Sequence, residues 1–358
     1  MDSQGHSTFA VMGVTETKVI RYDNAGEVEW SFVDPLSPDN DTIALAVDAS
    51  GNTYLGTTIR VGGDNEIRLR KFDATGATVW IRPYAEGHYN RLGMLAVDAS
   101  SHLIVAGTGE LADVPDSRMF VQKYSPDGQK LWEKRTGSSW SEISHIVSMA
   151  VGPSDEITVL TMSDDDYEPG EQSGVTRIGR DGQLKYRIAE SQILVSNPAQ
   201  LALDDFGNAY VTGFGGRIGT GADAVTAKYD AYGNRPWSVY YNEPVSSGQY
   251  GQAVGVDSVG DIRVLATANT RSDTSEDFSV LHYRQRDPAS TFRVQLIPDA
   301  GGTFHLGSPS GVPFQIEASP DLRHWSMLTE PETAQLLQPG ATAFSGSPQR
   351  FFRLIGEE

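Results

Sequence analysis

The sequence predicts an all-β protein: a six-bladed β-propeller with four-stranded antiparallel blades, followed by a small C-terminal β-rich domain. Two repeated turn motifs, each recurring about every fifty residues along the 358 residues, predict the blades. Each motif is flanked by β-branched and aromatic residues, which favour strands. No window of comparable length shows a helical period.

The first motif is a cation and an aromatic residue, then Asp-x-x-Gly, then an indole. It is clearest in four copies: Arg21-Tyr22-Asp23 to Trp30, Lys71-Phe72-Asp73 to Trp80, Lys123-Tyr124-Ser125 to Trp132, and Lys228-Tyr229-Asp230 to Trp237. A degenerate copy from Arg177 to Tyr186 and a stub at His282-Tyr283 complete six units. We expect the four repeated tryptophans to lie in the core.

The second motif, apolar-Asp-x-x-Gly-Asn, falls midway between copies of the first, at 47–52, 203–208 and, with Asp in the Asn place, 256–261. Ser101-His102 and 152–155 depart from it, so we expect those turns to be built differently. The Asp and Gly residues of both motifs favour tight turns between strands. We therefore expect each unit to contain four short strands. In the second unit these are 43–48, 53–58, 67–72 and 78–81. A sheet with two apolar faces is not stable alone. Stacking such sheets face to face around an axis buries both faces of each, and this arrangement is a β-propeller.

The units resemble bacterial β-propeller repeats of the SBBP type, most closely at 202–213 and 228–237. The resemblance covers about residues 1–285. Proteins with such repeats are typically secreted or displayed at the cell surface, and they have no general enzymatic assignment. The resemblance therefore implies a fold and an extracellular or surface location, and it implies little chemistry.

Both ends of the repeated region are incomplete. Asp2 to His6 align with Asp48 to Asn52, so the first unit lacks most of its innermost strand, and the last unit stops after 278–283. We expect a propeller domain over 1–288. Either its ring closes imperfectly or the N-terminus is clipped in this sequence, and 292–297 could supply one further strand. Residues 289–358, with strands at 314–319 and 350–354, resemble small C-terminal β modules of verrucomicrobial and planctomycetal secreted proteins.

Antiparallel order puts the short Asp-x-x-Gly turns at one end of the sheets and every long loop at the other. We expect this acidic long-loop face to bind a protein, a glycan or a cation, because function on rigid scaffolds concentrates in loops. The candidate binding residues are Asp41, Glu86, His88, Tyr89, Trp140, Glu243 and Tyr250. The competing interpretation is that these aromatic residues pack between blades and that loops simply tolerate charge.

A calcium site is the one cofactor hypothesis. Asp164, Asp166 and Glu168 place oxygens at alternate positions, but Pro169 occupies the place where a calcium loop needs Gly. The pattern favours a solvated acidic loop over a calcium site. The chain has no cysteine, and its seven histidines show no zinc-binding spacing.

The net charge of −19 argues against nucleic acid as a partner. No apolar run reaches the length of a membrane span, and the N-terminal residues show no signal peptide. The sequence predicts a non-catalytic binding or scaffold propeller. The alternative is a polysaccharide-acting hydrolase or lyase with acidic residues at the channel mouth, so whether a reaction is catalysed stays open.

Overall fold

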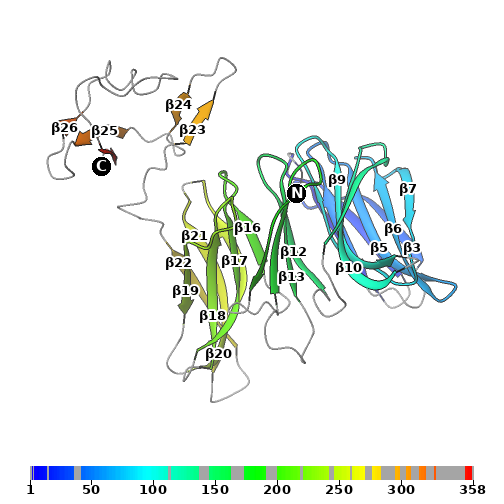
Figure 1. The fold of residues 1–358 in the computed structure, drawn as a ribbon. Coiled ribbons are helices and arrows are strands. Elements are labelled where there is room, and N and C mark those ends of the chain that lie inside the picture. Colours follow the sequence, from blue (N-terminus) through cyan, green and yellow to red (C-terminus); the bar gives the residue numbers. More distant parts are fainter. Residues whose placement is uncertain are drawn as a thin grey trace. The chain divides into compact units, whose positions relative to one another are not determined.

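The computed structural model describes residues 2, 4–13, 16–35, 42–111, 114–136, 145–162, 173–190, 200–217, 221–241, 246–258, 260–270, 276–283, 295–298, 304–307, 314–319, 326–327 and 351–356. These residues form strands and turns (Figure 1). Within them, no helix has the length and hydrophobicity that crossing a bilayer requires. The chain divides into two compact units, Met1–Tyr283 and Arg284–Glu358.

The first unit consists of antiparallel sheets whose strands follow chain order. The first sheet contains β1 (Ser7–Met12), β2 (Glu16–Tyr22) and β3 (Val28–Pro35). The second contains β4 (Ile43–Val47), β5 (Thr53–Val61), β6 (Asp64–Phe72) and β7 (Thr78–Tyr84). The third contains β8 (Asn90–Val97), β9 (Leu103–Leu111), β10 (Val114–Tyr124) and β11 (Lys130–Thr136). The fourth contains β12 (His145–Val151), β13 (Ile157–Met162), β14 (Ser173–Ile178) and β15 (Leu184–Glu190).

The remaining strands of this unit form two antiparallel groups joined by a single parallel pair, Ala222 with Gly248. We call these groups the fifth and sixth sheets. The fifth contains β16 (Gln200–Leu203), β17 (Ala209–Arg217), β18 (Gly221–Tyr229) and β19 (Trp237–Tyr241). The sixth contains β20 (Ser246–Val256), β21 (Ile262–Thr270) and β22 (Glu276–Tyr283).

The second unit contains two small sheets. One pairs β23 (Gln295–Pro298) with β24 (Phe304–Gly307), and the other has the order β26 (Ser326–Met327), β25 (Phe314–Ser319), β27 (Phe351–Gly356). Among the described residues β23 pairs with β24 alone, so the strand expected near 292–297 does not extend the sixth sheet.

The strands are longer than the repeats predict, because the strands expected at 53–58 and 67–72 extend toward each other and leave no long loop between them. β5 and β6 stay paired as far as Val61 and Asp64, and only Gly62 and Gly63 turn the chain. Both glycines have positive φ, 64° and 108°, which a tight hairpin turn requires and which glycine adopts at little steric cost. Backbone pairing, which continues to Val61 and Asp64, keeps this hairpin in the sheet.

The expectation that the turns at Ser101 and at 152–155 are built differently is also wrong. The Ser101 amide donates to the Asp98 carbonyl at 3.0 Å, as the Gly51 amide does to Asp48. The Asp155 amide donates in the same way to the Gly152 carbonyl. Ser101 and Asp155 therefore adopt the glycine conformation, with φ of 61° and 57°. The turn's hydrogen bonds hold a backbone that these residues adopt only at a cost.

Successive sheets pack face to face, and their innermost described strands touch in chain order: β1 with β4, β4 with β8, β8 with β12, β12 with β16, and β16 with β20. Apolar clusters fill the spaces between sheets. Between the first and second, for example, Val19 packs with Leu55 and Phe72. The core of this unit is therefore a series of layers between sheets, which is how stacked blades bury both faces.

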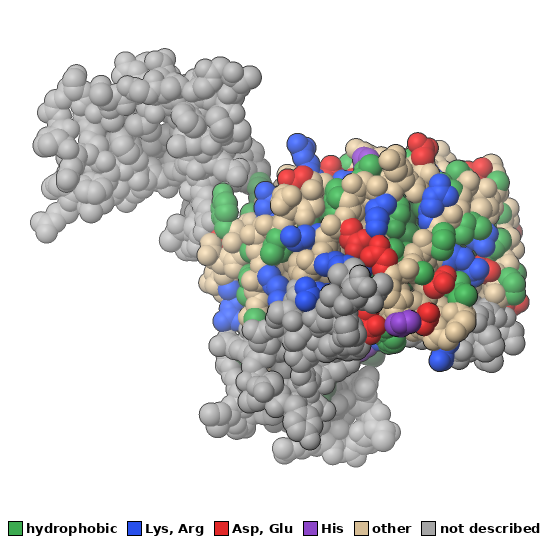
Figure 2. All heavy atoms as spheres, turned by 45° about the vertical axis from the view of Figure 1, so that its right-hand side comes forward, with side chains coloured by type: hydrophobic (Ala, Val, Ile, Leu, Met, Phe, Trp, Pro, Cys, Tyr) green, Lys and Arg blue, Asp and Glu red, His purple; other side chains and the backbone are tan. Residues whose placement is uncertain are grey.

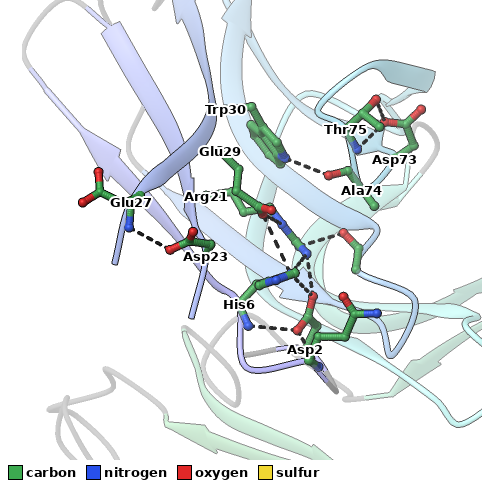
Figure 3. A network of polar contacts seen from close by, with 12 residues as sticks. Asp2, His6, Arg21, Asp23, Glu27, Glu29, Trp30, Asp73, Ala74 and Thr75 are labelled. Carbon is green, nitrogen blue, oxygen red and sulfur yellow. Dashed lines mark hydrogen bonds and ion pairs between the residues drawn. The ribbon is translucent and has the colours of Figure 1, made fainter. Parts of the chain in front are cut away.

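The repeated tryptophans connect one sheet to the next. Trp30 Nε1 donates to the Ala74 carbonyl at 3.1 Å, while Arg21 beside it holds Asp2 and Glu29 and reaches the Gly51 carbonyl at 3.0 Å (Figure 3). The expectation that these tryptophans are core residues holds only in part: Trp80 is buried and the other three are half-buried. Trp30, Trp80 and Trp132 lie over a turn of the following sheet, and Trp237 packs near the Tyr283 ring of the sixth sheet.

Candidate functional site

The structure places four of the seven predicted binding residues. Asp41, Trp140 and Glu243 lie outside the described residues, as do the predicted calcium ligands Asp164, Asp166 and Glu168. Glu86, His88 and Tyr89 share one loop, residues 85–89, between β7 and β8. Tyr250 lies in β20, in the sixth sheet.

The backbone of the 85–89 loop is fixed by its neighbours. The Tyr89 carbonyl accepts from the Glu110 amide at 3.0 Å, and the His88 carbonyl accepts from the Asn65 amide at 3.1 Å. The His88 ring is 82% exposed and pairs with Asp64 at 2.9 Å, and this hydrogen bond raises the pKa of His88. Tyr89 is 40% exposed. The loop therefore presents an imidazole and a phenol to solvent from a fixed backbone.

Glu86 belongs to a network that the sequence did not reveal. Arg135 binds Glu133 through Nε at 2.7 Å and Glu86 through a terminal nitrogen at 3.3 Å, and it also donates to the Tyr84 hydroxyl. Lys130 lies 2.8 Å from Glu133. Two carboxylates thus share one guanidinium between the second and third sheets, at the long-loop end.

The protonation states of this network do not suit proton transfer. Burial alone would raise the pKa of Glu133, but Lys130 and Arg135 outweigh it and lower that pKa. Burial raises the pKa of Tyr84 well above its usual value, against the opposing effect of Arg135. The carboxylate is a weak proton donor and the phenol a poor base near neutral pH, so the network connects two sheets rather than forming an acid–base pair.

The Tyr250 side chain packs against another aromatic ring and is not offered to solvent as a binding residue. Its ring lies 5.3 Å from the ring of Phe214 in an edge-on arrangement, across the fifth and sixth sheets, and it is half-buried. At this position the structure agrees with the interpretation of aromatics as packing between blades.

The described residues contain a better-formed concavity at the opposite, short-turn end. A cavity of about 320 Å³ lies where the innermost strands of the third, fourth and fifth sheets end in their turns. Its lining is part acidic and part apolar: Val97, Asp98, Ala99, Val151, Gly152, Pro153, Asp155, Leu203, Asp204 and Asp205. We call it the turn pocket.

Two of the four acidic residues in the turn pocket, Asp98 and Asp204, already accept hydrogen bonds from neighbouring parts of the chain. Asp204 accepts from the amides of Phe206 and Asn208 and from the Tyr210 hydroxyl. Asp98 accepts from its own turn amides and pairs with Lys123 at 2.7 Å. Burial alone would raise the pKa of Asp98, but Lys123 and the His102 amide outweigh it and lower that pKa. Asp98 thus remains ionised at the pocket.

The other two carboxylates, of Asp155 and Asp205, have no partner among the described residues. Asp205 is exposed and Asp155 is half-buried. Uncompensated carboxylates beside the ionised Asp98 give the turn pocket a negative potential. It can accept a cation or hydrogen-bond donors.

On the face that Figure 2 shows, acidic and basic side chains lie interspersed, with one group of acidic side chains near the middle. In the residues that the structure places, no three His, Asp or Glu side chains are arranged to hold a metal ion.

No protein-family model and no curated protein matches this sequence. Solved structures do. One is a polysaccharide lyase of the PL25 family, an ulvan lyase bound to -[GlcA(1-4)Rha3S]-, with 11% identity and a TM-score of 0.51 over 79% of this chain and 78% of that chain. Another is an apocarotenoid oxygenase mutant from Synechocystis, with 10% identity and a TM-score of 0.45. The match covers 76% of this chain and spans 66% of the oxygenase chain. A protein of unknown function from Dyadobacter fermentans has 7% identity and a TM-score of 0.44 over 78% and 92% of the two chains.

The likeness to the lyase concerns the fold alone. Together with the strand order it shows an all-β chain whose four-stranded antiparallel sheets are of the propeller-blade type. It assigns no family, and the resemblance to SBBP-type repeats stays a prediction from the sequence.

Sequence reasoning missed the turn pocket although the signal was present. Val97-Asp98, Val151-Gly152 and Leu203-Asp204 recur at one phase of the repeat, which puts all three turns at the same end of their sheets. The cavity itself depends on how far apart these turns lie, and no residue pattern encodes that distance.

Proposed function

We propose that this chain is a non-catalytic binding and scaffold protein that holds a cationic group of a protein partner in the turn pocket. The six sheets of the first unit form the scaffold, and the second unit acts as a tether or spacer. The six blades and the extracellular or cell-surface location remain predictions from the repeats. The turn pocket, with its two unpartnered carboxylates, carries the proposal.

The dimensions of the turn pocket favour a side chain as its ligand. At about 320 Å³ it is at the lower limit of small-molecule pockets, yet large enough for a guanidinium or ammonium group and its alkyl stem. Val97, Val151 and Leu203 would contact the stem, and Asp155 and Asp205 would bind the charged group. Pairing a cation with carboxylates through charge-assisted hydrogen bonds supplies both affinity and orientation.

The state of the described acidic groups supports binding over catalysis. A glycoside hydrolase needs one carboxylic acid with a raised pKa near a second carboxylate. The carboxyl groups whose pKa is shifted here, including Asp98 and Glu133, are shifted downward. Such groups stay ionised and attract cations.

The test is binding of a lysine- and arginine-rich peptide, measured by calorimetry at low and moderate salt. Asp155→Asn/Asp205→Asn should weaken binding at least tenfold, and added salt should weaken binding to the unaltered protein. Asn tolerates the positive φ at position 155, so the variant keeps the turn. Asp127→Asn is the matched control, because Asp127 is an exposed turn residue at the same end but outside the pocket. Equal binding by all three proteins would refute the proposal.

The alternative, action on a polysaccharide, is supported only by the fold likeness to the ulvan lyase. It is tested by incubating the protein with uronate-containing polysaccharides and measuring new chain ends. Release of such ends, lost on replacing an acidic residue of the loop face such as Glu86, would favour the enzyme over the binding protein.

A further inference from the structure

Four sheets of the first unit, the second to the fifth, each receive an aromatic ring from the sheet before them. The glycine in the turn between the last two strands of each sheet lies directly on that ring: Gly76 on Trp30, Gly128 on Trp80, Gly182 on Trp132, and Gly233 on Tyr186. A Cβ added to any of these glycines would come within 2.7 to 2.9 Å of a ring atom. We call this arrangement the ring seat.

The hydrogen bonds of the ring seat repeat as well. The indole nitrogens of Trp30, Trp80 and Trp132 donate to the carbonyls of Ala74, Pro126 and Arg180, at 3.1, 2.9 and 3.1 Å. In every case the acceptor lies two residues before the seated glycine. The ring seat is thus one interface that recurs between successive sheets.

The first sheet has the same seat, and it is empty. Gly26 has φ of 84°, and its amide closes the same turn onto the Asp23 carbonyl at 3.1 Å. Yet none of the residues that the structure places comes within 4 Å of an added Cβ at Gly26. The turn is fully formed, while the space that a ring fills in the next four sheets is open.

A second position in the first sheet repeats this vacancy. An added Cβ at Gly51 or Gly207 would meet the guanidinium of Arg21 or Arg177 from the preceding sheet, at 2.8 and 2.5 Å. At Gly5, the equivalent residue of the first sheet, it would meet only Asn24 Cβ, at 3.7 Å. The places for a cation and for a ring are therefore both unfilled.

The face around these two seats is apolar and exposed. Phe9, Val11 and Val33 are 55%, 57% and 46% exposed. In addition, among the described residues β1 pairs with β2 alone, whereas β5, the corresponding strand of the second sheet, pairs on both sides. Within the part of the chain that the structure describes, the first sheet therefore has no neighbour on its outer face and no strand along its inner edge.

We propose that this outer face binds one more sheet of the same repeat type, which seats an aromatic ring on Gly26 and brings its repeated cation to the turns of the first sheet. The proposal extends an interface that already recurs between the sheets of this chain. The sixth sheet does not meet the requirement, because no Gly-x-x-x-Trp pattern follows Tyr283 in the sequence. The occupant is thus an additional sheet bearing the cation, aromatic and Gly-x-x-x-Trp pattern.

The experiment supplies such a sheet within the full chain. A duplicate of residues 43–97 is inserted between Met1 and Asp2, because Val97-Asp98 aligns with Met1-Asp2 in the repeat. The insert brings a complete sheet, with Trp80 facing Gly26 and Lys71 facing the Asn24 carbonyl, the counterpart of its present partner Pro126, and it adds the missing strand beside β1. The control insert carries Trp80→Ala in the duplicate alone. Hydrogen exchange of the β1 amides and protease resistance of the insert are measured.

We expect the β1 amides that do not bond to β2 to exchange rapidly in the original chain and at least 100-fold more slowly with the insert, which should resist protease. The control insert should give at least tenfold less protection. Slow exchange of the same β1 amides in the original chain would mean that another part of the chain already covers this face, and it would overturn the proposal. So would a protease-sensitive insert, or equal protection by the two inserts.

Discussion

The indole of Trp80 packs against Gly128, and its nitrogen donates a 2.9 Å hydrogen bond to the Pro126 carbonyl. The ring comes from the second sheet and the turn from the third. Because the same relationship joins Trp30 to Gly76 and Trp132 to Gly182, the repeat in the sequence is also a repeat of the interface between sheets. A residue that breaks one ring seat should loosen one pair of sheets.

Replacing Gly128 by Ala tests the ring seat. Two costs combine: a left-handed backbone for alanine, and a Cβ 2.9 Å from the Trp80 ring, together about 2–4 kcal/mol of unfolding free energy. Gly26→Ala is the matched control, because it has the same positive φ and no ring nearby, and it should cost only about 1–2 kcal/mol. Urea unfolding followed by tryptophan fluorescence measures both. Equal losses of unfolding free energy in the two variants would mean that contact with the Trp80 ring does not add to the cost of Gly128→Ala.

Replacing Ser101 by Gly should stabilise the protein. Ser101 has φ of 61°, and relieving this conformation should gain more than the entropy that glycine loses, a net of about 0.5–1 kcal/mol. Ser100→Gly, one residue earlier in the same turn and without positive φ, should instead be neutral or destabilising. The midpoint of thermal unfolding should rise for Ser101→Gly and stay unchanged or fall for Ser100→Gly. A lower midpoint for Ser101→Gly would show that the backbone at Ser101 is not strained.

The carboxylate of Asp2 should make stability depend on acidity. Burial alone would raise the pKa of Asp2, but the amides of Gln4 and His6 and the guanidinium of Arg21 outweigh it and lower the pKa to about 2. A folded-state pKa below the unfolded value gives stability that is present above about pH 4 and lost as the pH falls toward 2, about 2 kcal/mol in all.

The measurement compares the original protein with Asp2→Asn by urea unfolding between pH 7 and pH 2. The variant should be less stable at pH 7, and the difference should vanish near pH 2. Other carboxylates titrate in both proteins, so the difference isolates Asp2. A difference that persists unchanged at pH 2 would rule out this linkage.

The buried pair of Lys123 and Asp98 connects the third sheet to the turn pocket. The two side chains are 8% and 1% exposed and lie 2.7 Å apart. Lys123→Met should cost about 3–5 kcal/mol, because it leaves a buried carboxylate without its cation. Adding Asp98→Asn should recover part of this loss, and a double-mutant cycle measures the coupling. Additive losses in the cycle would show that the pair is not coupled.

The sequence predicts the sheet pattern well because the residues that make the turns also make the contacts between sheets. Gly76 and Trp30, for example, both belong to the first repeated motif, and they contact each other across two sheets. The turns at Ser101 and Asp155 were mispredicted, because hydrogen bonds to Asp98 and Gly152 hold the backbone shape without glycine. Composition near Gly62 suggested a loop, whereas the strand pairing continues to it.

The candidate site was harder to foresee. The loop residues Glu86, His88 and Tyr89 do lie together, as neighbours in sequence must, but Glu86 is engaged by Arg135, which is 49 residues away. The turn pocket depends on the spacing of three turns from three sheets, and on which of their carboxylates the turns themselves occupy. Asp204 and Asp205 are adjacent and look alike in the sequence, yet only Asp205 is free of turn hydrogen bonds among the described residues.

The stacking of sheets through ring seats is tested most directly by the proton chemical shifts of the seated glycines. A glycine that lies on an aromatic ring has its α-proton resonance moved upfield by the ring current. The account predicts upfield resonances for Gly76, Gly128 and Gly182, loss of the Gly128 shift in Trp80→Leu, and an ordinary resonance for Gly26 in the same spectrum. Ordinary resonances for all four glycines, or an upfield Gly26, would contradict it.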